Sequence, residues 1–526
     1  MANRDIFVLR ESFAEFDDAY QTLIVPYLDF FGFPYREVRA EELNADCALI
    51  LAGADALGAE RVRAAVQAGA GLVCFADARR GAASEITFEK EQYITALHQP
   101  GEVRALYAPI LSGGNAPLAG GEVLLRAGEY PLLEIARLGK GKVAFWHSYG
   151  WMSHRKLGPL HGMDDVLWRS IVWAARKPFV MQGMPPMLGM RVDDVWGAWS
   201  ELSPENPLLW VEIAQSYGLK PWLGVFVDNI DARSAEKVRD YVKAGQASAF
   251  PHAFSGCEWV DTELPEHWAY LNHTDGPYSD EEMRENARRA KAWFDAHDIP
   301  ISKYALGHYY EVGKNALPYL REWGCEFIGM HMKPDTPYQS GADWLMAGPY
   351  RKYERDVLSA PRPVYYGDYV FDRAFFNCVT EIRDVCGYEW APSSQVEYTI
   401  QNGIAQVRRA LDSMCPAVLF THESCWIQRM TPKTWKRSLD GIFEAIAEYQ
   451  PELLTMDEIC GYARAKHDAT ICAAEVKENK LQLQLVGQND RETRCYVFTE
   501  DENGKISAKL AAIPQRSGAQ TVALAF

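Results

Sequence analysis

Two adjacent carboxylates, Asp193 and Asp194, close an apolar run about a third of the way along the 526-residue chain. Neighbouring side chains on a strand point to opposite faces, so both can serve one site only where the strand ends and the backbone turns. A turn or a helix N-cap would also explain the pair. Four histidines favour a functional site, because each falls near the end of a predicted strand: His252, His308, His331 and His422.

Such positions converge in space if the strands form a parallel barrel, because the carboxyl ends of all its strands meet at one rim. A carboxylate with two imidazoles, leaving one position open for water, suits catalytic zinc or a similar divalent ion. The spacing therefore predicts a metal-dependent hydrolase, and zinc is the ion that we expect.

The elements that must position these residues fall into three regions. Residues 1–180 alternate apolar runs with helical patterns, the latter at about 16–31, 58–68 and 164–175, and predict a flavodoxin-like α/β domain with a mainly parallel sheet. A linker rich in Met, Pro and Gly is expected over 176–189, and the strand and helix units over 181–466 predict a (β/α)7-8 barrel. Period-2 alternation over 467–526, with a turn signal at Asn503-Gly504, predicts a small antiparallel β-domain of the sandwich kind.

Composition restricts the classes of partner. The chain has 71 acidic and 54 basic residues, a net charge of -17, which argues against nucleic acid and against an anionic membrane surface. We see no apolar run of the ~18 residues that a membrane span needs and no signal-peptide pattern, and the 11 cysteines contain no CxxC pair. We therefore expect a cytoplasmic protein, and leave open whether it forms a homo-oligomer.

The order of strands and helices in residues 1–180 resembles the glutamine-amidotransferase-like domains found beside carbohydrate enzymes. An active amidotransferase needs a cysteine on a sharp elbow with small neighbours. Cys74 lies between Val73 and Phe75. We therefore predict that Cys74 is a buried core thiol and that this domain is not catalytic.

Several motifs over about 190–465 resemble those of the polysaccharide deacetylases, the NodB-like carbohydrate esterases of the family 4 type. Arg191-Val192-Asp193-Asp194 is similar to their Thr-Phe-Asp-Asp motif. Pro251-His252-Ala253-Phe254 is similar to their second motif, which contains histidine. Leu419-Phe420-Thr421-His422 is similar to their late Leu-x-x-His motif. Tyr309-Tyr310-Glu311 resembles the loop of the third motif. The fragment Asp343-Trp344 is the best match to the family's Asp-x-x-Asp-Trp motif.

The resemblance implies that Asp193 is a general base, Asp194 and His252 are metal ligands, and His422 is a general acid. The second motif normally has another histidine four residues on, where this chain has Gly256. His273 is our candidate for the third ligand, with His308 and Glu258 behind it. Candidate substrate contacts are Arg191, which would also orient Asp193, and His308, Tyr309, Glu311, His331 and Trp426.

The implied activity is the removal of an N-acyl group, chiefly acetyl, from an amino sugar in a small glycan or glycoside. Tryptophans in the loops could stack on sugar faces or could simply fill the core: Trp196, Trp199, Trp259, Trp268, Trp344 and Trp426. Two alternatives stay open. One is a glycoside hydrolase that uses carboxylates such as Asp193, Glu311 and Glu423, and the other is a sugar-binding protein without catalysis.

Overall fold

The computed structural model has a mixed α/β architecture with several sheets. It describes residues 2–78, 80–113, 118–152, 163–255, 271, 277–310, 312–329, 334–335, 362–364, 375–377, 389–424 and 426–526. Within these ranges no helix is both long and apolar enough to cross a bilayer.

The N-terminal region contains a nine-stranded sheet in the order β3-β2-β4-β5-β10-β9-β8-β6-β7. One half is parallel, as predicted, and consists of β2 (Ile6–Leu9), β3 (Tyr35–Val38), β4 (Leu49–Gly53), β5 (Gly71–Phe75) and β10 (Gly141–Trp146). The other half is antiparallel and consists of β6 (Ala82–Phe88), β7 (Val103–Leu111), β8 (Glu122–Ala127) and β9 (Tyr130–Leu138). The expectation of a mainly parallel sheet missed this half.

The helices of this region follow the expected pattern with one difference. Helices α3 (Glu60–Gln67) and α4 (Asp164–Ala174) lie where the sequence predicts them. The single helix expected over 16–31 is instead α1 (Asp17–Ala19) and α2 (Val25–Phe31), separated by a π-helical segment. Cys74 lies within β5 with no exposed surface, and burial raises the pKa of its thiol. The prediction of a buried core thiol is confirmed.

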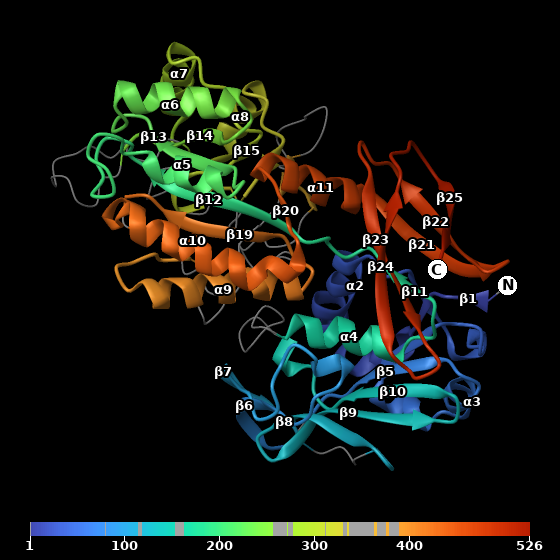
Figure 1. Cartoon of the computed structure of the whole chain (residues 1–526). Helices are drawn as coiled ribbons and strands as arrows, with labels where there is room; N and C mark the ends of the chain where they lie inside the picture. Colours follow the sequence, from blue (N-terminus) through green and yellow to red (C-terminus); the bar gives the residue numbers. More distant parts are fainter. Residues whose placement is uncertain are drawn as a thin grey trace.

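A second group of parallel strands carries most of the candidate site residues. It has the order β14-β13-β12-β19, built from β12 (Met187–Val195), β13 (Pro221–Phe226), β14 (Ser248–Ala253) and β19 (Ala417–His422), and β20 (Glu452–Leu453) pairs with β12. Helices lie around these strands in Figure 1: α5 (Leu209–Ser216), α6 (Ala232–Lys243), α9 (Val396–Asp412) and α10 (Pro432–Ile446).

Further short strands continue this series. An isolated parallel bridge joins Ala249 of β14 to Ile301, shortly before β15 (Tyr304–Ala305). Strand β15 pairs in parallel with β16 (Phe327–Ile328), which pairs in parallel with β18 (Phe375–Asn377), while β17 (Arg362–Val364) is antiparallel to β18. Helices α7 (Asp280–Ala296) and α8 (Leu317–Glu322) accompany them. Closure of these strands into a (β/α)7-8 barrel stays a prediction.

The expected linker contains regular structure. Strand β11 (Phe179–Met181) pairs with β23, and β12 already begins at Met187. The Met and Pro residues of this stretch are largely buried, with Met184 and Met187 each 2% exposed. Composition alone suggested a linker because it does not show which residues are buried.

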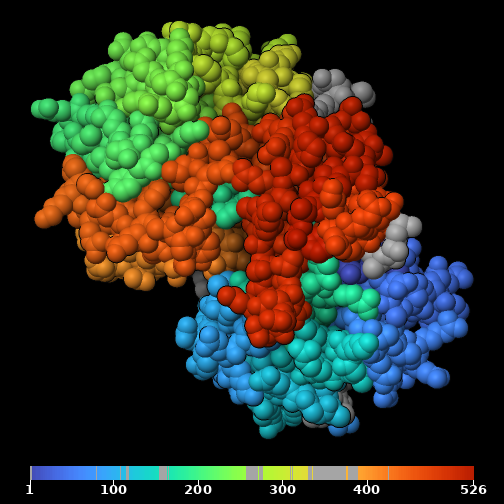
Figure 2. Space-filling model, turned by 45° about the vertical axis from the view of Figure 1, so that its right-hand side comes forward, coloured from blue at the N-terminus to red at the C-terminus, as the bar shows by residue number. Residues whose placement is uncertain are grey.

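The C-terminal strands are antiparallel, as the alternation predicts. They are β21 (Ala469–Lys477), β22 (Lys480–Gly487), β23 (Thr493–Glu500), β24 (Ile506–Ile513) and β25 (Gln520–Ala525), and β1 (Ala2–Asn3) adds to β21. Figure 2 shows these C-terminal residues lying against both the N-terminal region and the region that contains β12 to β19. The ion pair between Lys142 and Glu500 at 2.6 Å is one such contact.

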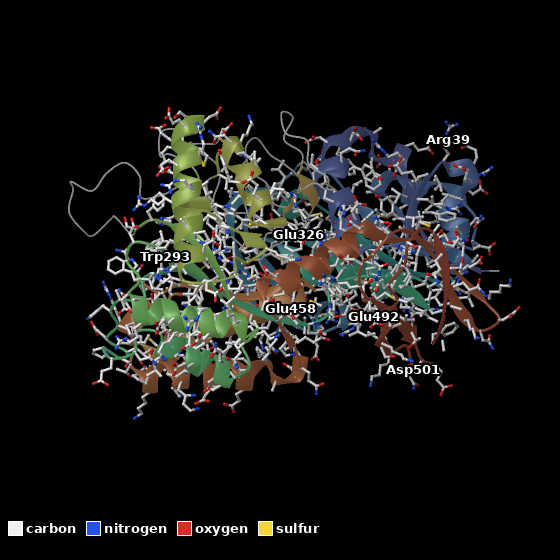
Figure 3. All side chains as sticks on the ribbon, turned by 90° about the horizontal axis from the view of Figure 1, so that it is seen from above. Arg39, Trp293, Glu326, Glu458, Glu492 and Asp501 are labelled. Atoms are coloured by element: carbon white, nitrogen blue, oxygen red, sulfur yellow. The ribbon has the colours of Figure 1, made fainter. Side chains whose placement is uncertain are left out.

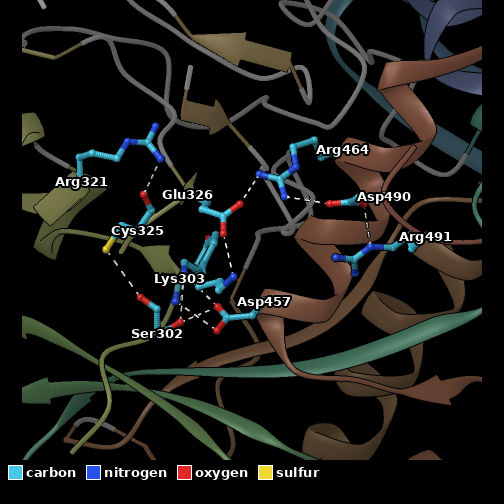
Figure 4. Close-up of polar contacts among 10 residues, drawn as sticks. Ser302, Lys303, Arg321, Cys325, Glu326, Asp457, Arg464, Asp490 and Arg491 are labelled. Atoms are coloured by element: carbon cyan, nitrogen blue, oxygen red, sulfur yellow. Dashed lines mark hydrogen bonds and ion pairs between the residues drawn. The ribbon is translucent and has the colours of Figure 1, made fainter. Parts of the chain in front are cut away.

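Helix α11 (Met456–Asp468) fixes the start of β15, the strand that leads to His308. Asp457 accepts hydrogen bonds from the Ser302 hydroxyl at 2.7 Å and the Tyr304 N–H at 2.9 Å (Figure 4). Arg464 on the same helix donates to Glu326 at 2.6 Å. Figure 3 places Glu326 and Glu458 in the middle of the molecule, between Trp293 and Arg39 near opposite ends.

Candidate metal centre

Asp193 and Asp194 both lie within β12, which continues to Val195, so the expectation that the strand ends at the pair is wrong in detail. The register of β12 against β13 shifts between Val192 and Val195, and Asp194 has a left-handed backbone with φ of 56°. Asp is among the non-glycine residues that adopt this conformation most readily. This irregularity interrupts the strict alternation and brings both carboxylates to one site.

Asp194, His252 and His308 form a group that could hold a metal ion. One ligand atom from each residue lies within 4.8 Å of the others. Oδ1 of Asp194 is 3.4 Å from Nε2 of His252 and 3.6 Å from Nε2 of His308. The side chains of His308 and Asp194 are only 10% and 12% exposed.

The hydrogen bonding of His252 fits a ligand. Its Nδ1 lies 2.9 Å from the carbonyl oxygen of Leu306, which accepts a hydrogen bond, so Nε2 presents its lone pair to the site. Within the described part of the chain, neither Nε2 of His252 nor Oδ1 of Asp194 has a hydrogen-bond partner. Buried polar atoms are nearly always satisfied, so these two atoms fit a shared cation.

The charge states of the group also suit a divalent ion. Burial alone would raise the pKa of Asp194, but His308, His422 and His252 hold that pKa below its usual value. Burial lowers the pKa of His308 to about 3 against the opposing pull of Asp194. An ionised carboxylate and a neutral imidazole are the forms that bind metals.

Arg191 holds Asp193 beside this group. Its Nε and Nη2 donate to the two oxygens of Asp193, each at 3.0 Å, and Nη2 also donates to the Tyr310 hydroxyl at 2.6 Å. Arg191 has no exposed surface, and its guanidinium lies 3.7 Å from the centre of the Phe420 ring. The expected role of Arg191 in orienting Asp193 is thus supported. Oδ2 of Asp193 lies 3.8 Å from Nε2 of His252.

His422 lies on the other side of Asp194, with its Nε2 4.0 Å from Oδ2 of that residue. Its Nδ1 donates to Glu389, which also accepts a hydrogen bond from Nε1 of Trp426. Burial lowers the pKa of His422, but Asp194, Glu389 and Asp193 outweigh this effect and raise the pKa to about 9. His422 is therefore a proton donor at neutral pH.

Glu389 is the site residue that the sequence interpretation missed. It precedes Trp390, whose N–H donates to the Phe420 carbonyl at 2.7 Å and so fixes this segment beside β19. An acidic residue followed by tryptophan was the signal sought at Asp343-Trp344, which lies outside the described residues. The same signal at Glu389-Trp390 would have found this residue.

Glu423, a candidate in the glycoside hydrolase alternative, is bonded on both oxygens. It accepts N–H groups from Trp196 at 2.6 Å, Gly197 at 2.9 Å and the Trp210 indole at 2.8 Å. Its side chain has no exposed surface, and burial raises its pKa to about 7. These contacts favour a role in holding the backbone over direct contact with a substrate.

The remaining predicted residues divide into two sets. His308 was expected either to contact the substrate or to replace His273 as the third ligand. It lies with the two predicted ligands, Asp194 and His252, which supports a role as a metal ligand. Trp426 lies beside Glu389. The described residues do not include His273, Glu258, Glu311, His331, Trp259, Trp268, Trp344 or the side chain of Tyr309.

The chain has low similarity to the solved structures that it matches. No family model and no curated protein matches the chain. A cytoplasmic protein of Salmonella typhimurium has 12% identity and a TM-score of 0.23, covering 30% of this chain and 88% of its own. A cytoplasmic protein of Salmonella typhimurium LT2 has 13% identity and a TM-score of 0.20, and the match covers 28% of this chain and 83% of that protein. A beta-arabinopyranosidase has 9% identity and a TM-score of 0.23, and the match covers 65% of this chain and 55% of that protein.

Proposed function

We propose that this protein is a metal-dependent hydrolase that removes an N-acyl group, chiefly acetyl, from an amino sugar of a small glycan or glycoside. The observation that carries the proposal is the meeting of Asp194, His252 and His308, with ligand atoms within 4.8 Å of one another. Asp193 and His422 flank this group at 3.8 Å from His252 and 4.0 Å from Asp194.

The residues of the site divide the work of amide hydrolysis. A divalent ion, for which we propose zinc, would supply an acidified water and polarise the acyl oxygen when bound. Asp193, held by Arg191, is placed to take a proton from the attacking water, and His422 to give one to the departing amine. Asp194 and Glu389 raise the pKa of His422, and the hydrogen bond to Glu389 orients the imidazole for this step.

The choice of substrate rests on the resemblance of the motifs around Asp193, His252 and His422 to the polysaccharide deacetylases. The acidic balance of the chain disfavours polyanions as substrates. We propose a short carbohydrate in the cytoplasm as the substrate, and a (β/α) barrel as the fold that presents the strand ends to it.

The test is to measure metal content by elemental analysis of the full chain purified without added metal, together with acetate release from N-acetylated amino sugars. We expect close to one divalent ion per chain and acetate release that a chelator abolishes and added metal restores. Asp194→Ala and His252→Ala should lose both metal and turnover. His467→Gln is the matched control, because the side chain of His467 is 42% exposed and contacts Asp468 and the ring of Phe376 in β18.

Two results would contradict the proposal. Cleavage of glycosidic bonds that survives chelation would favour a glycoside hydrolase that relies on carboxylates. Sugar binding with no bound metal and no acetate release, even after metal is added, would favour a non-catalytic binding protein.

A further inference from the structure

The loop between β12 and α5, residues 196–208, is hydrogen-bonded to the segment that follows β19. At its start, Oε2 of Glu423 accepts the backbone N–H groups of Trp196 and Gly197, at 2.6 Å and 2.9 Å. Because Oε1 of Glu423 accepts the indole N–H of Trp210 at 2.8 Å, the same carboxylate also ties the loop to α5. Glu423 is fully buried, so water does not compete for these bonds.

A second attachment lies four residues further along the loop. The carbonyl oxygen of Gln428 accepts the N–H of Glu201 at 2.6 Å and the hydroxyl of Ser200 at 3.3 Å. The Ser200 hydroxyl also accepts the N–H of Leu202 at 3.1 Å. Only Ala198 and Trp199 lie between the two attachments, so the tip of the loop has little conformational freedom.

Gly197 lets this turn pack closely against Ile230 and Ser234. Its backbone is left-handed, with φ of 55°, and a Cβ added there would lie 2.9 Å from Cγ1 of Ile230 and 3.1 Å from Cβ of Ser234. Ile230 lies in the connection between β13 and α6, and Ser234 lies in the first turn of α6, so the loop is held on a second side. Its geometry is therefore fixed before any ligand arrives.

Trp199 stands at the tip of this rigid loop and is 48% exposed. Among the tryptophans that the structure describes, no other is as exposed. Leaving a large aromatic side chain in water forgoes the stabilisation that burial would give. The Cα of Trp199 lies within roughly 4 Å of that of Ser200 and 8 Å of that of Gly197, since consecutive Cα atoms are about 3.8 Å apart. It therefore stays close to Gln428, in the segment that follows β19.

We propose that Trp199 forms a stacking platform for a pyranose ring next to the amino sugar that carries the acyl group, and that Glu423 is the positioning residue of this platform. A flat aromatic face on a preorganised loop binds a sugar ring without the cost of ordering the loop. The substrate is then at least a disaccharide. The inference rests on the proposed function only for the identity of the sugar.

The test is calorimetric titration with N-acetylglucosamine and with its β-1,4-linked disaccharide. The metal-loaded full chain carries Asp193→Asn throughout, so that it binds these sugars without turnover. We expect Trp199→Ala to weaken the binding of the disaccharide at least tenfold, and by a larger factor than that of the monosaccharide. Phe526→Ala is the matched control, because Phe526 is 47% exposed at the end of the chain, and it should bind both sugars like the unaltered protein.

Glu423→Gln tests the positioning role. An amide group has only one acceptor oxygen, so at least one of the three N–H donors must lose its partner. We expect faster amide hydrogen exchange in residues 196–201 and weaker binding of the disaccharide, although Trp199 is intact. Unchanged exchange in these residues would contradict the role of Glu423.

The outcomes separate this inference from the proposed function, because binding is measured without turnover. Disaccharide binding that depends on Trp199, with no acetate release, would remove the proposed activity and leave the platform. Equal binding by Trp199→Ala and the unaltered chain, or no binding of the disaccharide, would overturn the platform. Self-association that Trp199→Ala abolishes would instead assign the exposed tryptophan to contact with a second copy.

Discussion

Nε2 of His308 lies 3.6 Å from Oδ1 of Asp194, the same oxygen that Nε2 of His252 approaches at 3.4 Å. The two imidazole rings lie 5.2 Å apart between their centres. One carboxylate oxygen is thus shared by two imidazoles that come from different strand ends. This arrangement favours His308 as the third ligand, which the deacetylase resemblance lacks at Gly256.

The first prediction is that His308→Ala loses the metal. Removing one of three protein ligands should weaken metal affinity by at least tenfold, because the affinity of a divalent site depends on the number of its protein ligands. Metal per chain after dialysis, measured by elemental analysis, checks this. His273→Ala is the matched control and should keep the metal. The reverse result would assign the third position to His273.

The second prediction is that Asp193→Asn keeps the metal and loses turnover. An amide cannot take the proton of the attacking water, and general base assistance is worth ~10²–10⁴-fold. The unfolding temperature should also fall, because the buried guanidinium of Arg191 loses its charged partner. Steady-state kinetics, metal content and a thermal melt on the same sample check all three effects. Loss of metal in this variant would make Asp193 a ligand.

The third prediction concerns His422, which Glu389 holds beside Asp194. His422→Ala should slow amide hydrolysis by ~10²–10⁴-fold, because the departing amine needs a proton. An activated ester has a leaving group that departs without one, so its hydrolysis should fall much less. The ratio of the two rates in the variant and the unaltered chain is the measurement. Equal losses together with loss of metal would show that His422 is a ligand.

The sequence predicted much of this site because strand ends carry a readable signal. Apolar runs ending at His252 and His422 are visible in the sequence, and both residues lie where those runs suggest. The bulge at Asp194 is not readable, because its left-handed backbone depends on pairing with β13. Glu389 is different, because its signal, an acidic residue directly before a tryptophan, is local and was assigned to Asp343-Trp344 instead.

The fold shows the same division between local and non-local signals. The parallel strands β2, β4 and β5 are short apolar runs, and the sequence marks each one. The antiparallel strands β6 and β8 are partly exposed and carry charged residues such as Glu85 and Arg126, so they have no comparable apolar run. Strand β11 pairs with β23, which is distant in sequence, and no local sequence pattern predicts this pairing.

The last prediction concerns stability and involves Asp412, at the end of α9. Burial raises the pKa of Asp412 to about 6, although its hydrogen bond from Tyr449 opposes the shift. Because the folded pKa lies above the unfolded one, the contribution of this carboxyl to stability is present below about pH 4 and is lost as the pH rises through about 6. Asp412→Asn cannot ionise and should stabilise the protein at pH 7.5 by on the order of 1–2 kcal/mol, with no gain at pH 4. Urea denaturation at both pH values measures the difference.

Asp440→Asn is the matched control. The exposed carboxylate of Asp440 bonds to Lys436 and has a lowered pKa, so its removal should bring no gain in stability at pH 7.5. A stabilisation of Asp412→Asn that is equal at both pH values would contradict this account, because it could not arise from ionisation.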